Sequence, residues 1–184
     1  MKRVVVLLAE GFEEIEAVTP VDVLRRGGIE VVVAGVDADV VTGSHNLTFD
    51  TDTVIDEIDF AEFDGVILPG GLPGAVNLSK SQAVNSILEQ ARDEDKLIAA
   101  ICASPALVLS PLGLLDNKKT TGYPGVEFKF FERISYLEEK VIQDGSVITG
   151  MGPGAAFDFA LKILEYLVDS TTADKVAAAM LFRK

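Results

Sequence analysis

Residues 4–34 read VVVLLAEGFEEIEAVTPVDVLRRGGIEVVVA, and this stretch decides the fold. The β-branched run at 4–8 predicts a buried strand, and residues 29–34 predict a second one. Between them, residues 14–26 predict a helix that ends at the glycines 27–28. A βαβ unit of this kind joins parallel strands through a right-handed crossover, so the chain begins as an α/β protein.

The same alternation of short apolar runs and longer amphipathic stretches continues to the end of the chain. Residues 40–54 differ, because they are rich in Thr and alternate in polarity, which predicts a small β-ribbon turning near 43–46. The pattern predicts one mostly parallel sheet with helices on both faces, and sites at the carboxyl ends of its strands. The other predicted elements are strands at 65–68, 96–101 and 119–121, a hairpin at 140–149, and helices at 82–92, 103–112, 157–167 and 173–181.

Length and composition predict one globular domain over residues 1–184, of which 48% are hydrophobic. The 29 acidic and 16 basic residues give a net charge of −13, which repels nucleic acid and anionic lipid, so we expect neither as a partner. No signal peptide is visible, and no apolar run approaches the ~20 residues that span a membrane. The single cysteine suits a reducing compartment, so the cytoplasm is the expected location. The single histidine argues against a His-based metal site.

Cys102 is the only cysteine, and it directly follows the apolar strand at 96–101. Residues 103–106 then predict the start of a helix, with Pro105 in its first turn. Cys102 should therefore stand on a sharp strand-to-helix turn, which is where hydrolase elbows display their nucleophile. A helix N-terminus can lower a thiol pKa from ~8.5 to about 3.5–7.5. The alternative is an inert cysteine that packs as a small apolar residue.

Glu16 is the second candidate, because it shares one stripe of the predicted helix with Pro20, Val23 and Gly27. A lone carboxylate on an apolar stripe is costly unless it is paired or protonated. Glu16 could therefore be an acid of raised pKa that faces the site. The alternative is a glutamate that the helix dipole favours in the first turn.

Two glycine-rich turns follow predicted strands. The pair Gly70-Gly71 could turn backbone N–H groups inward, as an oxyanion hole requires, or form an ordinary turn. The run at 150–154 lacks the order of a dinucleotide motif and the Lys of a phosphate loop, so we expect no nucleotide or other cofactor. His45 lies in the turn of the ribbon, where a surface role is commoner than the role of a base.

Taken together, these residues resemble the ThiJ/PfpI superfamily, within it the branch of the Parkinson's-disease protein deglycase and YajL. The resemblance spans essentially the whole chain, and its motifs are specific. They are LAEGFEEIE at 8–16, PVDVLRR at 20–26, LPGG at 68–71, AAICA at 99–103 and GPG at 152–154.

This resemblance implies a flavodoxin-like three-layer sandwich and a homodimer. It implies that Cys102 is a reactive thiolate, with Glu16 as its hydrogen-bonded and protonated partner. The N–H groups of Gly71 and Ala103 match the donors of the family's oxyanion pocket. Glyoxalase or deglycase activity on methylglyoxal-type α-oxoaldehydes or their adducts is implied, as is ready oxidation of the cysteine to a sulfinic acid.

Two departures from the family pattern concern the pocket, to which Gly70 and Arg26 are also assigned. Residues 120–124 read TTGYP, where a human-type relative has Thr-Thr-His-Pro. The site histidine is therefore missing, and Tyr123 is expected in its space. His45 stands where relatives usually carry an Arg, and it is the only histidine able to approach the site.

Three functions are compatible with these residues. The first is a Cys102-dependent glyoxalase or deglycase acting on small reactive carbonyl compounds or glycated adducts. The second is a non-enzymatic redox sensor or holdase chaperone whose cysteine oxidises. The third, a cysteine peptidase or amidotransferase, has less support, because Ala103 follows the cysteine and no His exists beyond position 45.

Overall fold

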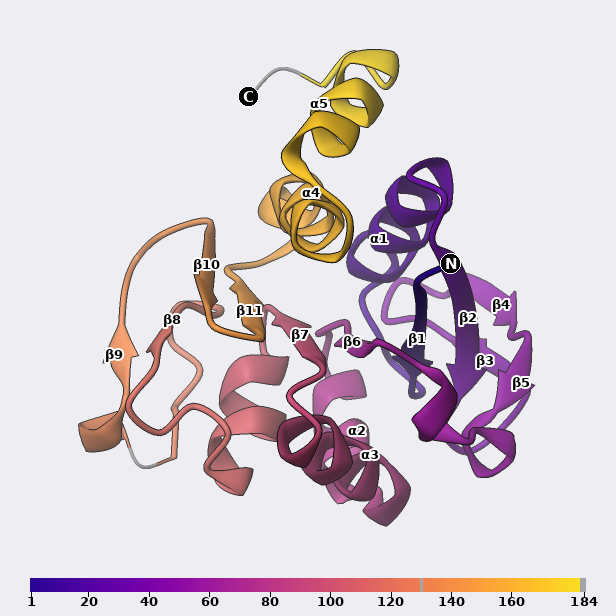
Figure 1. The fold of residues 1–184 in the computed structure, drawn as a ribbon. Coiled ribbons are helices and arrows are strands. Elements are labelled where there is room, and N and C mark those ends of the chain that lie inside the picture. Colours follow the sequence, from indigo (N-terminus) through magenta and orange to yellow (C-terminus); the bar gives the residue numbers. More distant parts are fainter. Residues whose placement is uncertain (130, 183–184) are drawn as a thin grey trace.

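The chain forms a seven-stranded sheet with the strand order β10-β11-β7-β6-β1-β2-β5 (Figure 1). The structure is a computed structural model, and it describes residues 1–129 and 131–182. Within these ranges, β10 is the only strand of the sheet that runs antiparallel to its neighbour. The strands are β1 (Arg3–Leu8), β2 (Glu30–Gly35), β5 (Thr53–Val54), β6 (Gly65–Leu68), β7 (Leu97–Ile101), β10 (Val141–Asp144) and β11 (Val147–Gly150).

Helices cover both faces of the sheet, as the sequence pattern predicts (Figure 1). Three of them, α1, α4 and α5, lie on one face, and α2 and α3 lie on the other. This is the flavodoxin-like three-layer arrangement. The helices are α1 (Glu14–Arg26), α2 (Gly74–Lys80), α3 (Gln82–Asp93), α4 (Ala156–Leu167) and α5 (Ser170–Ala179).

The interior strand β1 explains why the sheet needs both helical layers. Val4 and Val6 pack into the apolar cluster on the side of α1 and α4, whereas Val5 and Leu7 pack into the cluster on the side of α3. All four side chains are fully buried. Successive side chains of a strand point to opposite faces, so a strand covered on both faces is apolar without alternation.

The predicted β-ribbon forms from β3 (Val40–Thr42) and β4 (Thr48–Asp50), which pair antiparallel. Its predicted end is wrong, because residues 53–54 leave the ribbon and join the main sheet as β5. A second small sheet lies beside the main one, where β8 (Lys119–Thr120) pairs parallel with β9 (Ser135–Tyr136).

The regular helix predicted over 103–112 is also wrong. A π-helical turn at Pro105–Leu109 is followed by a 3-10 turn at Ser110–Leu112, which Gly113 ends in the left-handed conformation. The physical reason is Pro111, which has no N–H to continue the hydrogen bonds of an α-helix. The short helix α2 was not predicted, and α5 begins at Ser170, three residues before its predicted start, since Asp169 caps it.

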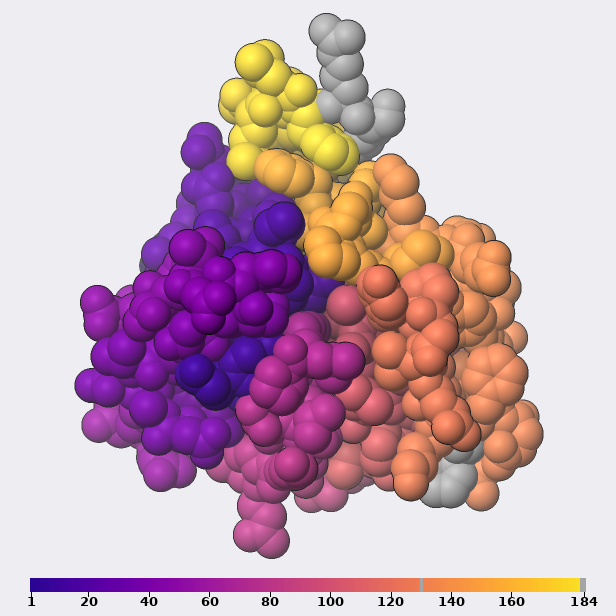
Figure 2. Space-filling view, turned by 180° about the vertical axis from the view of Figure 1, so that it is seen from behind, coloured from indigo at the N-terminus to yellow at the C-terminus, as the bar shows by residue number. Residues whose placement is uncertain are grey.

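The C-terminal helices lie across one end of the molecule, on the N-terminal and middle segments of the chain (Figure 2). Among the described residues, no helix has the length and apolar character that crossing a membrane requires.

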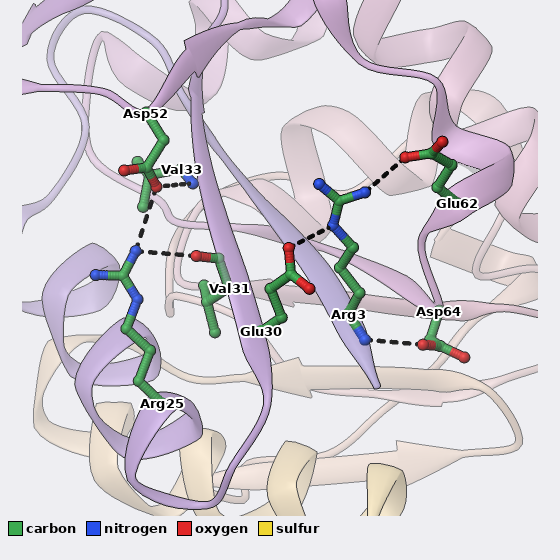
Figure 3. A network of polar contacts seen from close by, with 8 residues as sticks. All are labelled: Arg3, Arg25, Glu30, Val31, Val33, Asp52, Glu62 and Asp64. Atoms are coloured by element: carbon green, nitrogen blue, oxygen red, sulfur yellow. Dashed lines mark hydrogen bonds and ion pairs between the residues drawn. The ribbon is translucent and has the colours of Figure 1, made fainter. Parts of the chain in front are cut away.

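Charged contacts gather around Arg3, the first residue of β1 (Figure 3). Arg3 forms ion pairs with Glu30 at 2.9 Å and Glu62 at 2.7 Å, and its amide donates to Asp64 at 2.8 Å. These residues lie at the amino ends of the strands, away from the carboxyl ends where sites form. Exposed ion pairs contribute only about 0–1 kcal/mol each, so the network supports the sheet edge modestly.

Candidate active site

Strand β7 ends at Ile101 and presents Cys102 on a strained turn at the carboxyl edge of the sheet. The φ angle of Cys102 is +64°, in the left-handed region that residues with a side chain seldom adopt. Two backbone hydrogen bonds hold this conformation: the Cys102 amide donates to Gly150 O at 2.9 Å, and the Tyr123 amide donates to Cys102 O at 2.7 Å. The predicted sharp turn after the strand is therefore present, although a π-helical turn follows it in place of the α-helix, and Cys102 is 8% exposed.

Glu16 reaches the same place from the first turn of α1 and is fully buried. The Gly70 amide donates to its Oε2 at 2.8 Å, whereas its Oε1 is buried and accepts no hydrogen bond from the described residues. A Cβ atom at Gly70 would lie 2.6 Å from Cys102 Cβ and 2.8 Å from Glu16 Oε2. Gly70 thus lies between the two side chains, and its lack of a side chain lets them meet.

Burial raises the pKa of Glu16 to about 7, although hydrogen bonds with the Gly70 amide and Cys102 lower it in part. The Cys102 thiol pKa is also raised, to about 12, by burial, by the negative charge of Glu16 and by their hydrogen bond. The expected lowering of the thiol pKa is therefore wrong, because burial is the largest cause and raises it. Instead of a regular α-helix, which would bring a full dipole, a short π-helical turn follows Cys102.

The two groups titrate as a pair, because two anions cannot share this buried pocket. At neutral pH the pair carries at most one negative charge. If the thiol proton moves to Glu16, the net charge of the pair is unchanged and the negative charge lies on the Cys102 sulfur. Backbone hydrogen bonds from Gly71 and Ala103 lower the Cys102 pKa, so they stabilise the sulfur anion.

The Gly71 amide donates to Cys102 from a backbone conformation that favours glycine. Its φ is +93°, and a Cβ atom there would lie 2.5 Å from the amide nitrogen of Glu13. On the other side of the pocket, the Ser104 hydroxyl donates to Pro69 O at 2.5 Å and ties the two loops together. These contacts fix both amide donors before any ligand binds.

The backbone of Tyr123 lies beside this pocket, because its amide donates to Cys102 O, whereas its side chain is half-exposed. Its ring packs next to Gly152, where an added Cβ would lie 3.3 Å from the ring. Tyr123 and Pro124 together separate two hollows of about 440 and 410 Å³. The prediction that the Tyr123 hydroxyl takes the place of the family histidine stays a prediction.

Arg26 lies outside the pocket of its own chain, so its assignment there is corrected. It belongs to the last turn of α1 and pairs with Asp22 at 2.9 Å. Ten residues separate it from Glu16, which corresponds to ~15 Å along a helix.

His45 contacts the first turn of α1, although it is 31 positions away from Glu14 in the sequence. Its Nδ1 lies 2.8 Å from Glu14 Oε2, and its backbone amide donates to Glu14 Oε1 at 2.7 Å. The hydrogen bond with Glu14 raises the pKa of His45. No analysis of sequence spacing could have paired these two residues.

Ligand-type atoms of Glu13, Glu14 and His45 lie within 4.8 Å of one another. A metal ion placed there would have to displace the hydrogen bonds that Glu14 already makes with the turn at 43–47. Glu13 is likewise engaged, because its Oε2 accepts from the Glu16 amide at 2.8 Å and caps the helix. We therefore assign no metal to this cluster.

Replacing Gly70 by Ala should displace Cys102 from Glu16 and destabilise the protein. The new methyl group would overlap both side chains, and overpacking of a filled site costs about 1–3 kcal/mol. Urea unfolding measures this loss. Gly154→Ala is the matched control, because an added Cβ there meets nothing within 4 Å. Equal stability of the two variants would contradict the tight packing described for Gly70.

Glu16→Gln should stabilise the folded protein above pH 7. The pKa of Glu16 rises from an unfolded value of 4.5 to about 7 on folding, so its contribution to stability is fully present below pH 4.5 and is lost as the pH rises to 7. The difference corresponds to about 3 kcal/mol. Gln can still accept from the Gly70 amide but carries no charge.

Urea unfolding of wild type and Glu16→Gln at pH 5 and pH 8 tests this expectation. The advantage of the Gln variant should grow between the two pH values. Glu89→Gln, a change at an exposed residue of α3, is the control and should show no such growth. A Gln variant that loses stability as the pH rises, relative to wild type, would contradict the raised pKa.

Comparison with known proteins assigns this chain to a family. Residues 2–166 match the DJ-1/PfpI family. The chain belongs to the DJ-1/PfpI family. Protein DJ-1 homolog A of Arabidopsis thaliana is 37% identical over 99% of the chain, which spans only 47% of that relative's length.

Two further relatives match along most of their own length. Parkinson disease protein 7 homolog of Danio rerio is 41% identical, and the match covers 99% of the chain and 98% of that protein. Glutathione-independent glyoxalase DJR-1.2 of Caenorhabditis elegans is 36% identical, with 89% and 87% covered. Among solved structures, oxidized Toxoplasma gondii DJ-1 matches with a TM-score of 0.93 and 38% identity over 100% of both chains. The DJ-1/PfpI resemblance and the flavodoxin-like fold are therefore confirmed.

Proposed function

We propose that this DJ-1/PfpI protein is a glutathione-independent glyoxalase that also acts as a deglycase on adducts of methylglyoxal-type α-oxoaldehydes. The observation that carries the proposal is the buried pair of Cys102 and Glu16, which shares a pocket with the amide donors Gly71 and Ala103. The name of the Caenorhabditis elegans relative, a glutathione-independent glyoxalase, supports the same reaction class.

The reaction begins when the Cys102 proton passes to Glu16 and the sulfur attacks the aldehyde carbon of methylglyoxal. A carbon–sulfur bond forms, and the carbonyl electrons move onto oxygen. The Gly71 and Ala103 amides stabilise this oxyanion, which takes the proton from Glu16 to give a hemithioacetal. Because the pKa of Glu16 is about 7, the same carboxyl group can both donate and accept a proton at neutral pH.

Glu16, now a carboxylate, removes the hydrogen from the former aldehyde carbon and returns it to the neighbouring ketone carbon. The proton of the hemithioacetal hydroxyl passes to the ketone oxygen at the same time, so the product is a lactoyl thioester on Cys102 whose hydroxyl lies on the former ketone carbon. Water then adds to the thioester, the carbon–sulfur bond breaks, and lactate leaves. The overall change is methylglyoxal plus water to lactate, with no oxidant or second thiol consumed.

We further propose that the protein forms a homodimer in the cytoplasm. Exposed apolar side chains support a second copy as partner, because Ile15 and Val18 on α1 lie open together with Leu47 on the ribbon turn. Light scattering at several protein concentrations measures the oligomeric state. The single free cysteine and the acidic charge are compatible with the cytoplasm.

The experiment that tests the function is the conversion of methylglyoxal to lactate by the purified protein without added glutathione. Lactate formation that is proportional to protein concentration supports the glyoxalase. Release of free amine from a methylglyoxal-treated peptide, measured in parallel, tests the deglycase activity. If neither product forms, the enzymatic assignment is wrong.

A redox sensor or holdase chaperone is the second candidate. It is favoured by the buried acid beside the thiol, since a protonated Glu16 can donate a hydrogen bond to an oxidised sulfur. The oxidized form of the Toxoplasma gondii relative points the same way. Mass spectrometry after mild peroxide treatment should then find two added oxygen atoms on Cys102. A peptidase or amidotransferase is less supported, because the one His of the chain binds Glu14.

A further inference from the structure

The turn at 43–47 wraps around the carboxylate of Glu14 and holds His45 in one orientation. Glu14 is buried, and it accepts from the amide of His45 at 2.7 Å and from the hydroxyl of Ser44 at 3.4 Å. Its Oε2 lies 2.8 Å from His45 Nδ1. A carboxylate at this nitrogen fixes the tautomer with the proton on Nδ1, which leaves the lone pair on Nε2. The side chain of His45 is 70% exposed, so Nε2 can meet water.

This pair is joined to the Cys102 pocket by the loop that precedes α1. The Ser44 amide donates to Phe12 O at 2.8 Å, and the Glu13 amide donates to Gly70 O at 3.0 Å. Gly70 is the residue that lies between Cys102 and Glu16. Glu13 also interacts electrostatically with both Glu16 and His45. A base open to solvent and a buried acid therefore flank one short loop.

We propose that His45, oriented by Glu14, is the general base that activates water for hydrolysis of the Cys102 thioester. The inference rests on the proposed glyoxalase function and adds a division of labour to it. Glu16 is buried and transfers protons to and from the substrate, whereas His45 is open to solvent and accepts a proton from the incoming water.

In this step His45 Nε2 takes one proton from water while the water oxygen bonds to the thioester carbon. The tetrahedral intermediate then collapses, the carbon–sulfur bond breaks, and its electron pair stays on Cys102 sulfur. The imidazolium then releases its proton to solvent, and a proton from solvent restores the thiol–Glu16 pair. The negative charge of Glu14 stabilises the imidazolium while it exists.

The test isolates this step with His45→Gln. Wild type and variant are mixed with methylglyoxal, quenched at intervals and examined by mass spectrometry for Cys102 carrying the mass of one methylglyoxal. We expect the adduct to decay about 10²-fold more slowly in the variant, the low end for loss of a general base, and to accumulate during turnover. Free imidazole should restore part of the decay rate in His45→Ala.

The pH dependence of adduct decay separates proton transfer from a structural role. The charged groups beside His45 are Glu14, the first residue of α1, and Glu13, which caps that helix. Glu14→Gln removes the charge that raises the His45 pKa, so the pH at which decay reaches half its maximum should fall. Glu89→Gln is the control: Glu89 is exposed on α3, on the other face of the sheet, and its replacement should leave the decay unchanged.

The outcomes also separate this inference from the proposed function. Absence of lactate in wild type overturns the function itself. Normal lactate formation with equal adduct decay in wild type and His45→Gln, or an unchanged pH profile in Glu14→Gln, overturns only the role of His45.

Discussion

Cys102→Ser is expected to abolish the conversion of methylglyoxal to lactate. A buried serine hydroxyl does not pass its proton to a carboxyl group of pKa about 7, so no nucleophile forms beside Glu16. Removal of a covalent nucleophile costs up to about 10⁶-fold in kcat, so turnover should fall by several orders of magnitude. Lactate measured over a long incubation at high protein concentration gives the upper limit.

Two controls accompany this variant. Thermal unfolding shows whether Cys102→Ser is folded, and Tyr166→Phe, purified in parallel, should keep full turnover, which shows that the loss comes from Cys102 and not from the purification. Tyr166 lies beside Lys2 and Asp95 and so is remote from the candidate site. Full turnover by a folded Cys102→Ser variant would falsify the covalent mechanism.

Glu16→Gln is expected to lower the Cys102 thiol pKa and, at the same time, to reduce turnover. The charge of Glu16 contributes to the raised thiol pKa, whereas the Gly71 and Ala103 amides continue to lower it. The variant should therefore form its thiolate at lower pH than wild type. It has no group to move protons between the substrate carbons, so turnover should fall by about 10²- to 10⁴-fold.

Ultraviolet absorbance of the thiolate as a function of pH measures the first effect, and lactate formation measures the second. Glu13→Gln is the matched control, since it removes a neighbouring carboxylate but can still cap α1. It should change both quantities far less. A Glu16 variant with a raised thiol pKa, or with wild-type turnover, would contradict the coupling between these two groups.

The order of strands and helices was predictable because it depends on local patterns. The apolar run at 4–8 and the helix at 14–26 each lie within one stretch of sequence, and both are present. The placement of Cys102 on a sharp turn was predictable for the same reason. The irregular segment after it was not, since it depends on how Pro111 interrupts a helix that local propensity favours.

The electrostatics of the site depend on contacts between distant residues, and these were less accessible from the sequence. The raised thiol pKa results first from burial of Cys102 and then from Glu16, which lies 86 positions earlier in the chain and meets Cys102 through the packing around Gly70. The hydrogen bond between Glu14 and His45 likewise forms only when the ribbon packs against the start of α1. Arg26 was misplaced because a motif match carries no information on where a side chain points.

The burial of the only thiol provides a way to measure how often the protein opens in solution. Because Cys102 is the only cysteine and is 8% exposed, a bulky disulfide reagent should react with it far more slowly than a small alkylating agent. The ratio of the two labelling rates reports how often the protein opens enough to admit the larger reagent. One chromophore is released per labelled chain, so the reaction itself counts these openings.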